Sequence, residues 1–373
     1  MRRHTVSRLR CGLAGACLGV LLGLDPGTAS AQARPGMGPP PAPDAGPSDR
    51  WHLQPASQAN LWFHTMAVIA ADQPGPLGLY SADYARYIRD VKMQAGVYPT
   101  ALDSLASDLR KDIGDAKGNL EVLHFIPLYF PNADAEQMLR ALRAVARGRT
   151  SDAALSTPEV RFGAFVVAQA MEAGGDRRLL QRLVDVAERE WDVFYRQYWS
   201  DHLTELQGRI GEMQSMWDSF VAPQLGSFLE RRRLSAGLVM PSRALGPEGR
   251  IIDIEQFQRG DQVVAVQEPL ASNSPDATVY AFLKELCFLI IDDQALAGEA
   301  LSDDALQDLR RTAAVRCGAM LLEFYAPTLS ARYRRVFLDA VGAEESSTVA
   351  AFERVYYLDP AIVEKLRDQI RGQ

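Results

Sequence analysis

The chain has 373 residues, a formal net charge of −7 at pH 7 and 47% hydrophobic residues, a composition typical of a globular protein and not of a disordered one. The negative charge argues against a nucleic-acid partner, because a protein that binds a polyanion needs a clustered basic face. The short basic run Arg231-Arg232-Arg233 is typical of the last turn of a helix, where cations are favourable.

The N-terminus has the pattern of a secretory signal peptide. Four arginines among the first ten residues precede an apolar stretch from Cys11 to Leu24, which is short for a transmembrane helix. Ala29-Ser30-Ala31 or Ala31-Gln32-Ala33 then provides an A-x-A cleavage pattern. We therefore predict a signal peptide at residues 1–33 and a mature protein that is exported, periplasmic or extracellular, and not an integral membrane protein. An uncleaved membrane anchor is the alternative.

Residues 34–50 contain six prolines and three glycines, and such a segment cannot bury a core. We interpret it as a linker. Residues 51–373 are then the globular domain, in which residues 51–233 form a helical part and residues 234–373 form a second part with a small sheet and further helices.

Apolar residues recur at spacings of three and four over most of this domain, which predicts amphipathic helices. In the first part, the ranges with this pattern are 57–71, 82–94, 99–114, 134–147 and 158–172. Two long apolar stripes, 180–198 and 203–220, predict one broken helix or an antiparallel pair, with Ser200 and Asp201 as cap residues and Pro223 closing the second stripe. Residues 122–130 are apolar but contain Pro127, so we expect a buried loop or a short strand there.

The second part begins with short β-branched runs separated by glycine and proline. These runs, at 237–240, 251–254 and 261–266, predict a small antiparallel sheet. The helical pattern then returns at 277–292, 303–325, 327–342, 346–357 and 359–371. The predicted fold class is therefore mainly α (α+β), a helical domain with a small sheet that precedes a buried helix.

The helix predicted from Tyr280 to Ile291 is apolar on every side except at Lys284 and Glu285. A helix that is apolar all round is normally buried. Two adjacent ionisable groups in its middle are costly to desolvate unless each has a partner, and such groups often mark a functional site. The alternative is that Lys284 extends to solvent and Glu285 is an ordinary solvated carboxylate.

The run Lys284-Glu285-Leu286-Cys287-Phe288 resembles the His-Glu-x-x-His helix of zincin metallopeptidases, with the glutamate in register. In that family the two histidines bind zinc and the glutamate is the general base. The resemblance implies a zincin-like fold for residues 237–325, with Lys284 and Phe288 at the histidine positions. Glu323, on a later helix, would match the third ligand.

The zinc-ligand histidines are absent, since all five histidines of the chain precede residue 203. We therefore expect no metal, no cofactor and only a vestigial role for Glu285. The resemblance then implies an inactive peptidase-like protein that binds a peptide or protein partner at Lys284, Phe288 and Glu323. Two alternatives stay open, an active hydrolase with an unrecognised site and a structural helical protein of the envelope.

Other candidate sites have simpler explanations. His64 and His124 lie in apolar segments, where a hydrogen-bonded core histidine is more common than a metal ligand. The acidic residues that follow Asp292 lack the order of a calcium loop. Cys287 and Cys317 remain after signal cleavage, and the sequence does not decide whether they pair.

Overall fold

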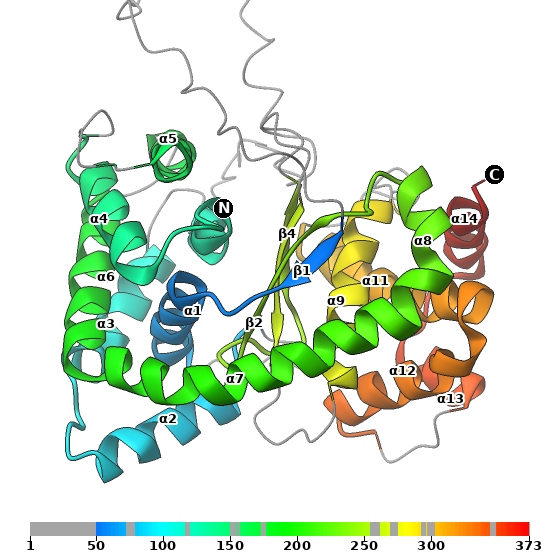
Figure 1. Ribbon diagram of the computed structural model, residues 1–373, viewed down its shortest axis with the longest axis horizontal. Helices are drawn as coiled ribbons and strands as arrows, with labels where there is room; N and C mark the ends of the chain where they lie inside the picture. Colours follow the sequence, from blue (N-terminus) through cyan, green and yellow to red (C-terminus); the bar gives the residue numbers. More distant parts are fainter. Residues whose placement is uncertain are drawn as a thin grey trace, which may run out of the picture. The chain divides into compact units, whose positions relative to one another are not determined.

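The computed structural model describes residues 50–71, 79–115, 120–149, 155, 157–172, 177–253, 262–268, 275–291, 296, 303–343 and 348–372. The chain divides into two compact units, Met1–Pro39 and Pro40–Gln373, and all described residues belong to the second. The predicted signal peptide and the linker up to residue 49 lie outside the described residues. Within the second unit the fold is mainly helical with one small sheet, so the predicted α+β class is confirmed (Figure 1).

The first group of helices covers one side of the sheet (Figure 1). Its elements are α1 (Ser57–Ala70), α2 (Ala82–Gln94), α3 (Ala101–Asp115), the 3-10 turns η1 (Leu120–His124) and η2 (Ile126–Tyr129), α4 (Ala135–Ala146), α5 (Pro158–Glu172) and α6 (Arg177–Glu190). Side-chain caps explain where several of these helices begin. The Ser81 side chain accepts from the backbone of Tyr84, and Asp134 forms a capping box with Gln137.

Two expectations for this group are corrected. Residues 122–130 form the two buried 3-10 turns and not a loop or a strand. The two apolar stripes form neither an antiparallel pair nor a helix broken at Ser200, because α6 continues through η3 (Trp191–Tyr195) into α7 (Arg196–Met216) and then through η4 (Trp217–Val221) into α8 (Ala222–Arg231).

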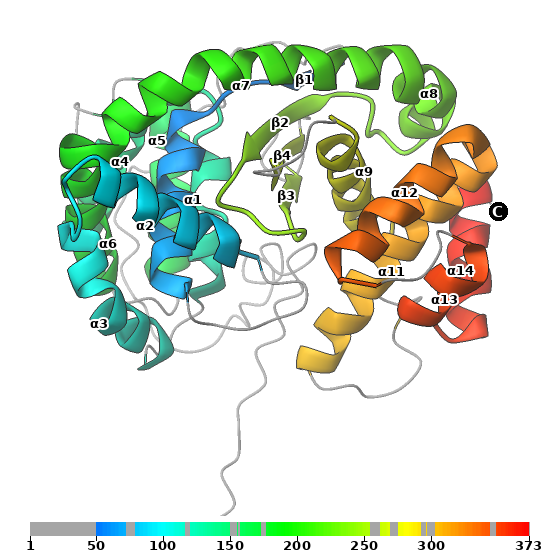
Figure 2. The same cartoon turned by 90° about the horizontal axis from the view of Figure 1, so that it is seen from below.

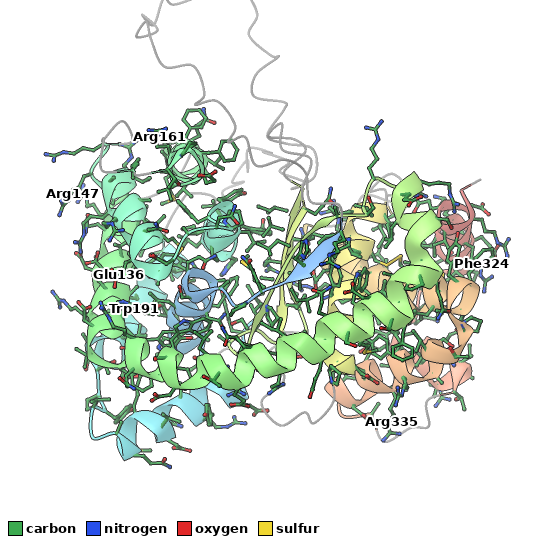
Figure 3. The ribbon with its side chains drawn as sticks, viewed as in Figure 1. Glu136, Arg147, Arg161, Trp191, Phe324 and Arg335 are labelled. Carbon is green, nitrogen blue, oxygen red and sulfur yellow. A yellow bond between two sulfur atoms is a disulfide. The ribbon has the colours of Figure 1, made fainter. Side chains whose placement is uncertain are left out.

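The turns η3 and η4 are π-helical, and the helix axis changes direction at both (Figures 1 and 2). Trp191 of η3 donates its ring N–H to Glu136 of α4 at 3.4 Å, and both residues are labelled in Figure 3. Pro223 lies directly after η4, in the first turn of α8, so it marks the change of direction and does not end the helix.

The sheet has four strands in the order β1-β2-β4-β3. The strands are β1 (Trp51–Leu53), β2 (Gly237–Ser242), β3 (Arg250–Asp253) and β4 (Gln262–Gln267). It is mixed and not antiparallel as predicted, because β2 pairs in parallel with both β1 and β4, and only β3 runs antiparallel to β4. β2 and β4 are buried along almost their whole length, as expected for parallel strands covered on both faces.

The second group of helices lies on the other side of the sheet (Figure 1). Its elements are α9 (Asp276–Ile290), α11 (Asp303–Tyr325), α12 (Pro327–Ala340), α13 (Val349–Val355) and α14 (Pro360–Arg371). α9 packs directly on β3 and β4. Its Phe282 ring lies 4.7 Å from the ring of Trp51 and 4.6 Å from that of Trp217, so the start of the domain, the long helix and α9 share one core.

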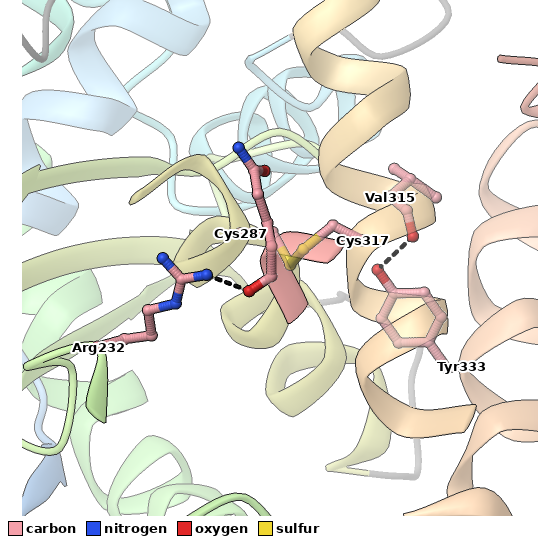
Figure 4. Close-up of a disulfide and its surroundings, with 6 residues drawn as sticks. Arg232, Cys287, Val315, Cys317 and Tyr333 are labelled. Carbon is pink, nitrogen blue, oxygen red and sulfur yellow. Dashed lines mark hydrogen bonds between the residues drawn. A yellow bond between two sulfur atoms is a disulfide. The ribbon is translucent and has the colours of Figure 1, made fainter. Parts of the chain in front are cut away.

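Cys287 of α9 and Cys317 of α11 form a disulfide in this core, with their Cα atoms 6.0 Å apart and both side chains fully buried (Figure 4). The bridge fixes the two helices that follow the sheet against each other. This settles the pairing that the sequence left open.

We expect the double substitution Cys287→Ala with Cys317→Ala to lower the free energy of unfolding by about 2–4 kcal/mol, because the bridge limits the freedom of the unfolded chain. Urea unfolding of both proteins without reductant measures the difference. If the variant unfolds at the wild-type urea midpoint, the bridge contributes nothing to stability.

Candidate functional site

The predicted buried pair of ionisable groups exists on α9. The side chains of Lys284 and Glu285 are 4% and 1% exposed, and the ammonium of Lys284 forms an ion pair with the carboxylate of Glu285. Lys284 Nζ also donates to the carbonyl of Pro247 at 3.2 Å. The backbone N–H of Gly249 donates to Glu285 Oε1 at 2.7 Å. The pair is therefore held by the turn that leads into β3, and both charges have hydrogen-bond partners, as buried charges require.

Gly249 lets this turn approach α9 closely. A Cβ atom at residue 249 would lie 2.5 Å from the carbonyl oxygen of Ala265 and 2.8 Å from the side chain of Glu285. Because no real Cβ contact is this short, only glycine fits between β4 and the carboxylate without a shift of the backbone. The turn-rich sequence before β3 thus has a specific role, which is to bring a backbone donor to Glu285.

Lys284 and Phe288 are also neighbours. The Lys284 ammonium lies 5.4 Å from the centre of the Phe288 ring, in a cation–π contact between residues four apart on α9. Positions 284 and 288 therefore share one face of α9, the helix that packs on β3.

A second ionic group lies next to this pair. Glu248 is buried and forms ion pairs with Arg250 of β3 at 2.5 Å and with Arg311 of α11 at 3.0 Å. Burial alone would raise the pKa of Glu248, but the charges of Arg250, Arg311 and Lys284 outweigh this effect and lower it. The carboxylate is thus held ionised at neutral pH and ties the turn before β3 to α11.

Glu323 does not join this group. Its side chain is 43% exposed and forms an ion pair with Arg334 of α12 at 2.7 Å. The structure therefore brings Lys284, Glu285 and Phe288 together, whereas the residue matched to a third ligand is committed to a neighbouring helix. The predicted acidic residues Asp292, Asp293 and Glu299 lie outside the described residues.

Sequence reasoning missed a buried polar cluster between α1, α2, α3 and α6. Glu190 Oε1 lies 2.7 Å from Lys92 Nζ and 3.0 Å from His64 Nε2, and all three side chains are fully buried. Thr100 Oγ1 donates to Glu190 Oε2 at 2.6 Å, and Asp103 pairs with Lys92 at 2.9 Å. The one sequence signal was Lys92, a charged residue on the buried face of an amphipathic helix.

The two histidines considered as metal ligands have separate partners. His64 Nδ1 lies 2.9 Å from the hydroxyl of Tyr84, and His124 Nδ1 lies 2.7 Å from that of Tyr80. Burial, with the nearby charge of Arg250, lowers the pKa of His124 to about 4. Among the residues that the structure describes, no three His, Cys, Asp or Glu side chains are arranged to hold a metal ion. His64 is a hydrogen-bonded core residue, and His124 is a hydrogen-bonded residue that is half-buried.

The pKa of His64 is lowered by burial, although Glu190 acts to raise it. The native protein therefore keeps His64 neutral at a pH where the unfolded chain, with an ordinary pKa near 6.5, already binds a proton. Stability is lost as the pH falls below this value. The depressed pKa of Glu190, about 2, gives a contribution that is present above the ordinary value of 4.5 and is lost only at lower pH.

We expect the free energy of unfolding to fall as the pH is lowered from 7 to 5. His64 alone should contribute up to about 1.4 kcal/mol per pH unit to this fall. His64→Gln should remove the contribution of His64 to the slope of the unfolding free energy against pH. His52→Gln, at an exposed position, should leave this slope unchanged. Urea unfolding at a series of pH values measures both. An unchanged slope in His64→Gln would contradict a neutral buried imidazole.

No helix in the described part of the chain is both long and apolar enough to cross a membrane.

Comparison with known proteins gives no match of any kind: no family model, no curated protein and no solved structure is significantly similar to this chain.

Proposed function

We propose that the protein is exported and binds a peptide or protein partner at a zincin-like site that has lost its catalytic metal. The observation that carries the proposal is the buried Lys284–Glu285 ion pair beside the edge strand β3. In a zincin, the metal supplies the positive charge next to this glutamate. Here the Lys284 ammonium supplies it.

Three further features support this interpretation. The sheet comes first, α9 packs on β3 and β4, and α11 follows, which is the order that the resemblance implies. Lys284 and Phe288 lie on one face of α9, as two ligands four residues apart on a helix do. Disulfides such as Cys287–Cys317 persist mainly in exported proteins, because the cytosol keeps thiols reduced.

Catalysis by the zincin mechanism is not expected. Without histidines at positions 284 and 288, Glu285 has no metal-bound water to deprotonate. Its carboxylate instead accepts from the Gly249 N–H and pairs with Lys284, so it is no longer free to act as a base. Because Lys284 and Glu285 are themselves buried, we propose that the binding surface lies on the strand next to them.

The strand β3 is the most suitable element of that surface. Among the described residues it is the last strand of the sheet and pairs with β4 along one edge, and we propose that an extended peptide adds to its other edge by backbone hydrogen bonds. Ile251 is half-buried on this strand.

A mixture of tryptic peptides from denatured casein tests binding and catalysis together. A photoreactive amino acid at Ile251 should cross-link to peptides, whereas the same group at Val193, which is 60% exposed on η3, should not. Mass spectrometry should recover the peptides uncut. Equal cross-linking at the two positions would contradict binding at β3. Cleavage that Glu285→Gln abolishes would instead establish an active hydrolase.

A further inference from the structure

A groove runs between the long helix α7 and α12, and none of the residues that line it belongs to the proposed site. Its volume is about 750 Å³. In Figures 1 and 2 the C-terminal part of α7 runs beside the second group of helices, to which α12 belongs. The groove is lined by Gly208, Gly211, Glu212, Ser215, Met216, Phe220, Pro275, Asp276, Thr328, Leu329 and Arg332.

The α7 wall is open because it carries glycine where a side chain would fill the groove. A Cβ atom added at Gly208 or at Gly211 would meet no atom within 4 Å. Met216 and Leu329 give the groove an apolar floor, and both are mostly buried. Phe220, which is 56% exposed, ends the groove on η4. An exposed aromatic side chain next to an open apolar groove is a common feature of helix-binding surfaces.

The charges around the groove favour a cationic occupant. Glu212 is exposed and has no ion-pair partner among the described residues. On the opposite wall, Asp276 pairs with Arg332 at 3.3 Å, and the Arg332 side chain is 69% exposed. Two carboxylates thus line the groove against one guanidinium. The whole chain is acidic as well, which favours encounter with a basic partner and disfavours a second copy of itself.

We propose that this groove docks a cationic amphipathic helix of a partner protein. The apolar face of that helix packs on Met216, Phe220 and Leu329, and its backbone approaches α7 where the glycines leave space. Its basic residues pair with Glu212, the exposed carboxylate of the α7 wall. The groove contains neither Lys284 nor Glu285, so each of the two proposals can be tested without the other.

A labelled synthetic helix of leucine and lysine is the probe, and the matching leucine and glutamate helix is its control. Fluorescence anisotropy should show saturable binding of the lysine peptide alone. Gly211→Leu fills the groove where the space is open and should weaken binding at least about tenfold. Gly226→Leu, at another helical glycine with open space around it, should leave the affinity unchanged. Glu212→Gln should weaken binding and reduce its dependence on salt.

Three results would overturn the proposal. The first is equal binding of the two peptides, and the second is an unchanged affinity in Gly211→Leu. The third is a wild-type dimer in sedimentation equilibrium that Gly211→Leu converts to a monomer, because the occupant would then be a second copy of this chain. Cross-linking of casein peptides at Ile251 should persist in Gly211→Leu, which separates this test from that of the proposed function.

Discussion

Replacing Lys92 by methionine is expected to lower the free energy of unfolding by about 3–5 kcal/mol, the usual cost of removing one partner from a buried ion pair. Lys92 Nζ is fully buried between Glu190 at 2.7 Å and Asp103 at 2.9 Å. Burial alone would raise the pKa of Glu190, but His64 and Lys92 lower it to about 2, so the carboxylate is charged at pH 7. Without the ammonium, two carboxylates remain buried together with no cation between them.

Urea unfolding at pH 7 measures this effect. Lys111→Met, at an exposed position of α3, is the matched control and should change stability by less than about 0.5 kcal/mol. Adding Glu190→Gln to Lys92→Met should recover part of the lost unfolding free energy, because one of the two unpaired carboxylates is then replaced by a neutral amide. A loss below about 1 kcal/mol in Lys92→Met would show that the cluster is not a buried charge network.

Lys284→Met is expected to have a similarly large effect, again about 3–5 kcal/mol. Removal of the ammonium leaves the Glu285 carboxylate 1% exposed, with the Gly249 N–H as its remaining described donor. The contact of Lys284 with the Phe288 ring is lost as well. We expect Lys284→Met with Glu285→Gln to be more stable than Lys284→Met alone, since the unpaired charge disappears and the amide oxygen still accepts from Gly249.

The same Lys111→Met variant serves as the control for this pair. If Lys284→Met unfolds within about 1 kcal/mol of the wild type, the ion pair does not contribute to the fold. If the second substitution gives no recovery, the loss in Lys284→Met comes from packing and not from charge.

The helices were predictable because their signals are local. The helix predicted at 303–325 has these bounds in α11, and α12 begins at Pro327 as expected. The sequence identified α9 as a buried helix, because only Lys284 and Glu285 interrupt its apolar pattern, but it left open whether these two charges are buried as a pair or reach solvent. These features depend on periodicity, caps and proline, all of which lie within a few residues of their effect.

The features that the sequence did not predict depend on contacts between distant parts of the chain. β1 was missed because Trp51–Leu53 is too short to show a pattern, and it pairs with β2 from the far end of the first helical group. The π turn of η3 was unforeseen because it arises within a continuous apolar stripe that packs against α4. The partner of Glu323 was also unforeseeable, since Arg334 reaches it from a different helix. Contacts between distant elements are not encoded in local periodicity.

We propose that the Lys284 ammonium takes the place of a metal ion beside Glu285. The most direct test is zinc titration of the variant that carries Lys284→His and Phe288→His. Two histidines four apart on one helix face can bind zinc, and the ion would replace the missing charge next to Glu285.

We predict that this variant binds one zinc ion per chain and that zinc raises its melting temperature, because a metal that binds only the folded state stabilises it. The wild type and the variant with Lys284→Met and Phe288→His should show neither effect. The account is contradicted if the double-histidine variant takes up no more zinc than the wild type and melts at the same temperature with and without the metal.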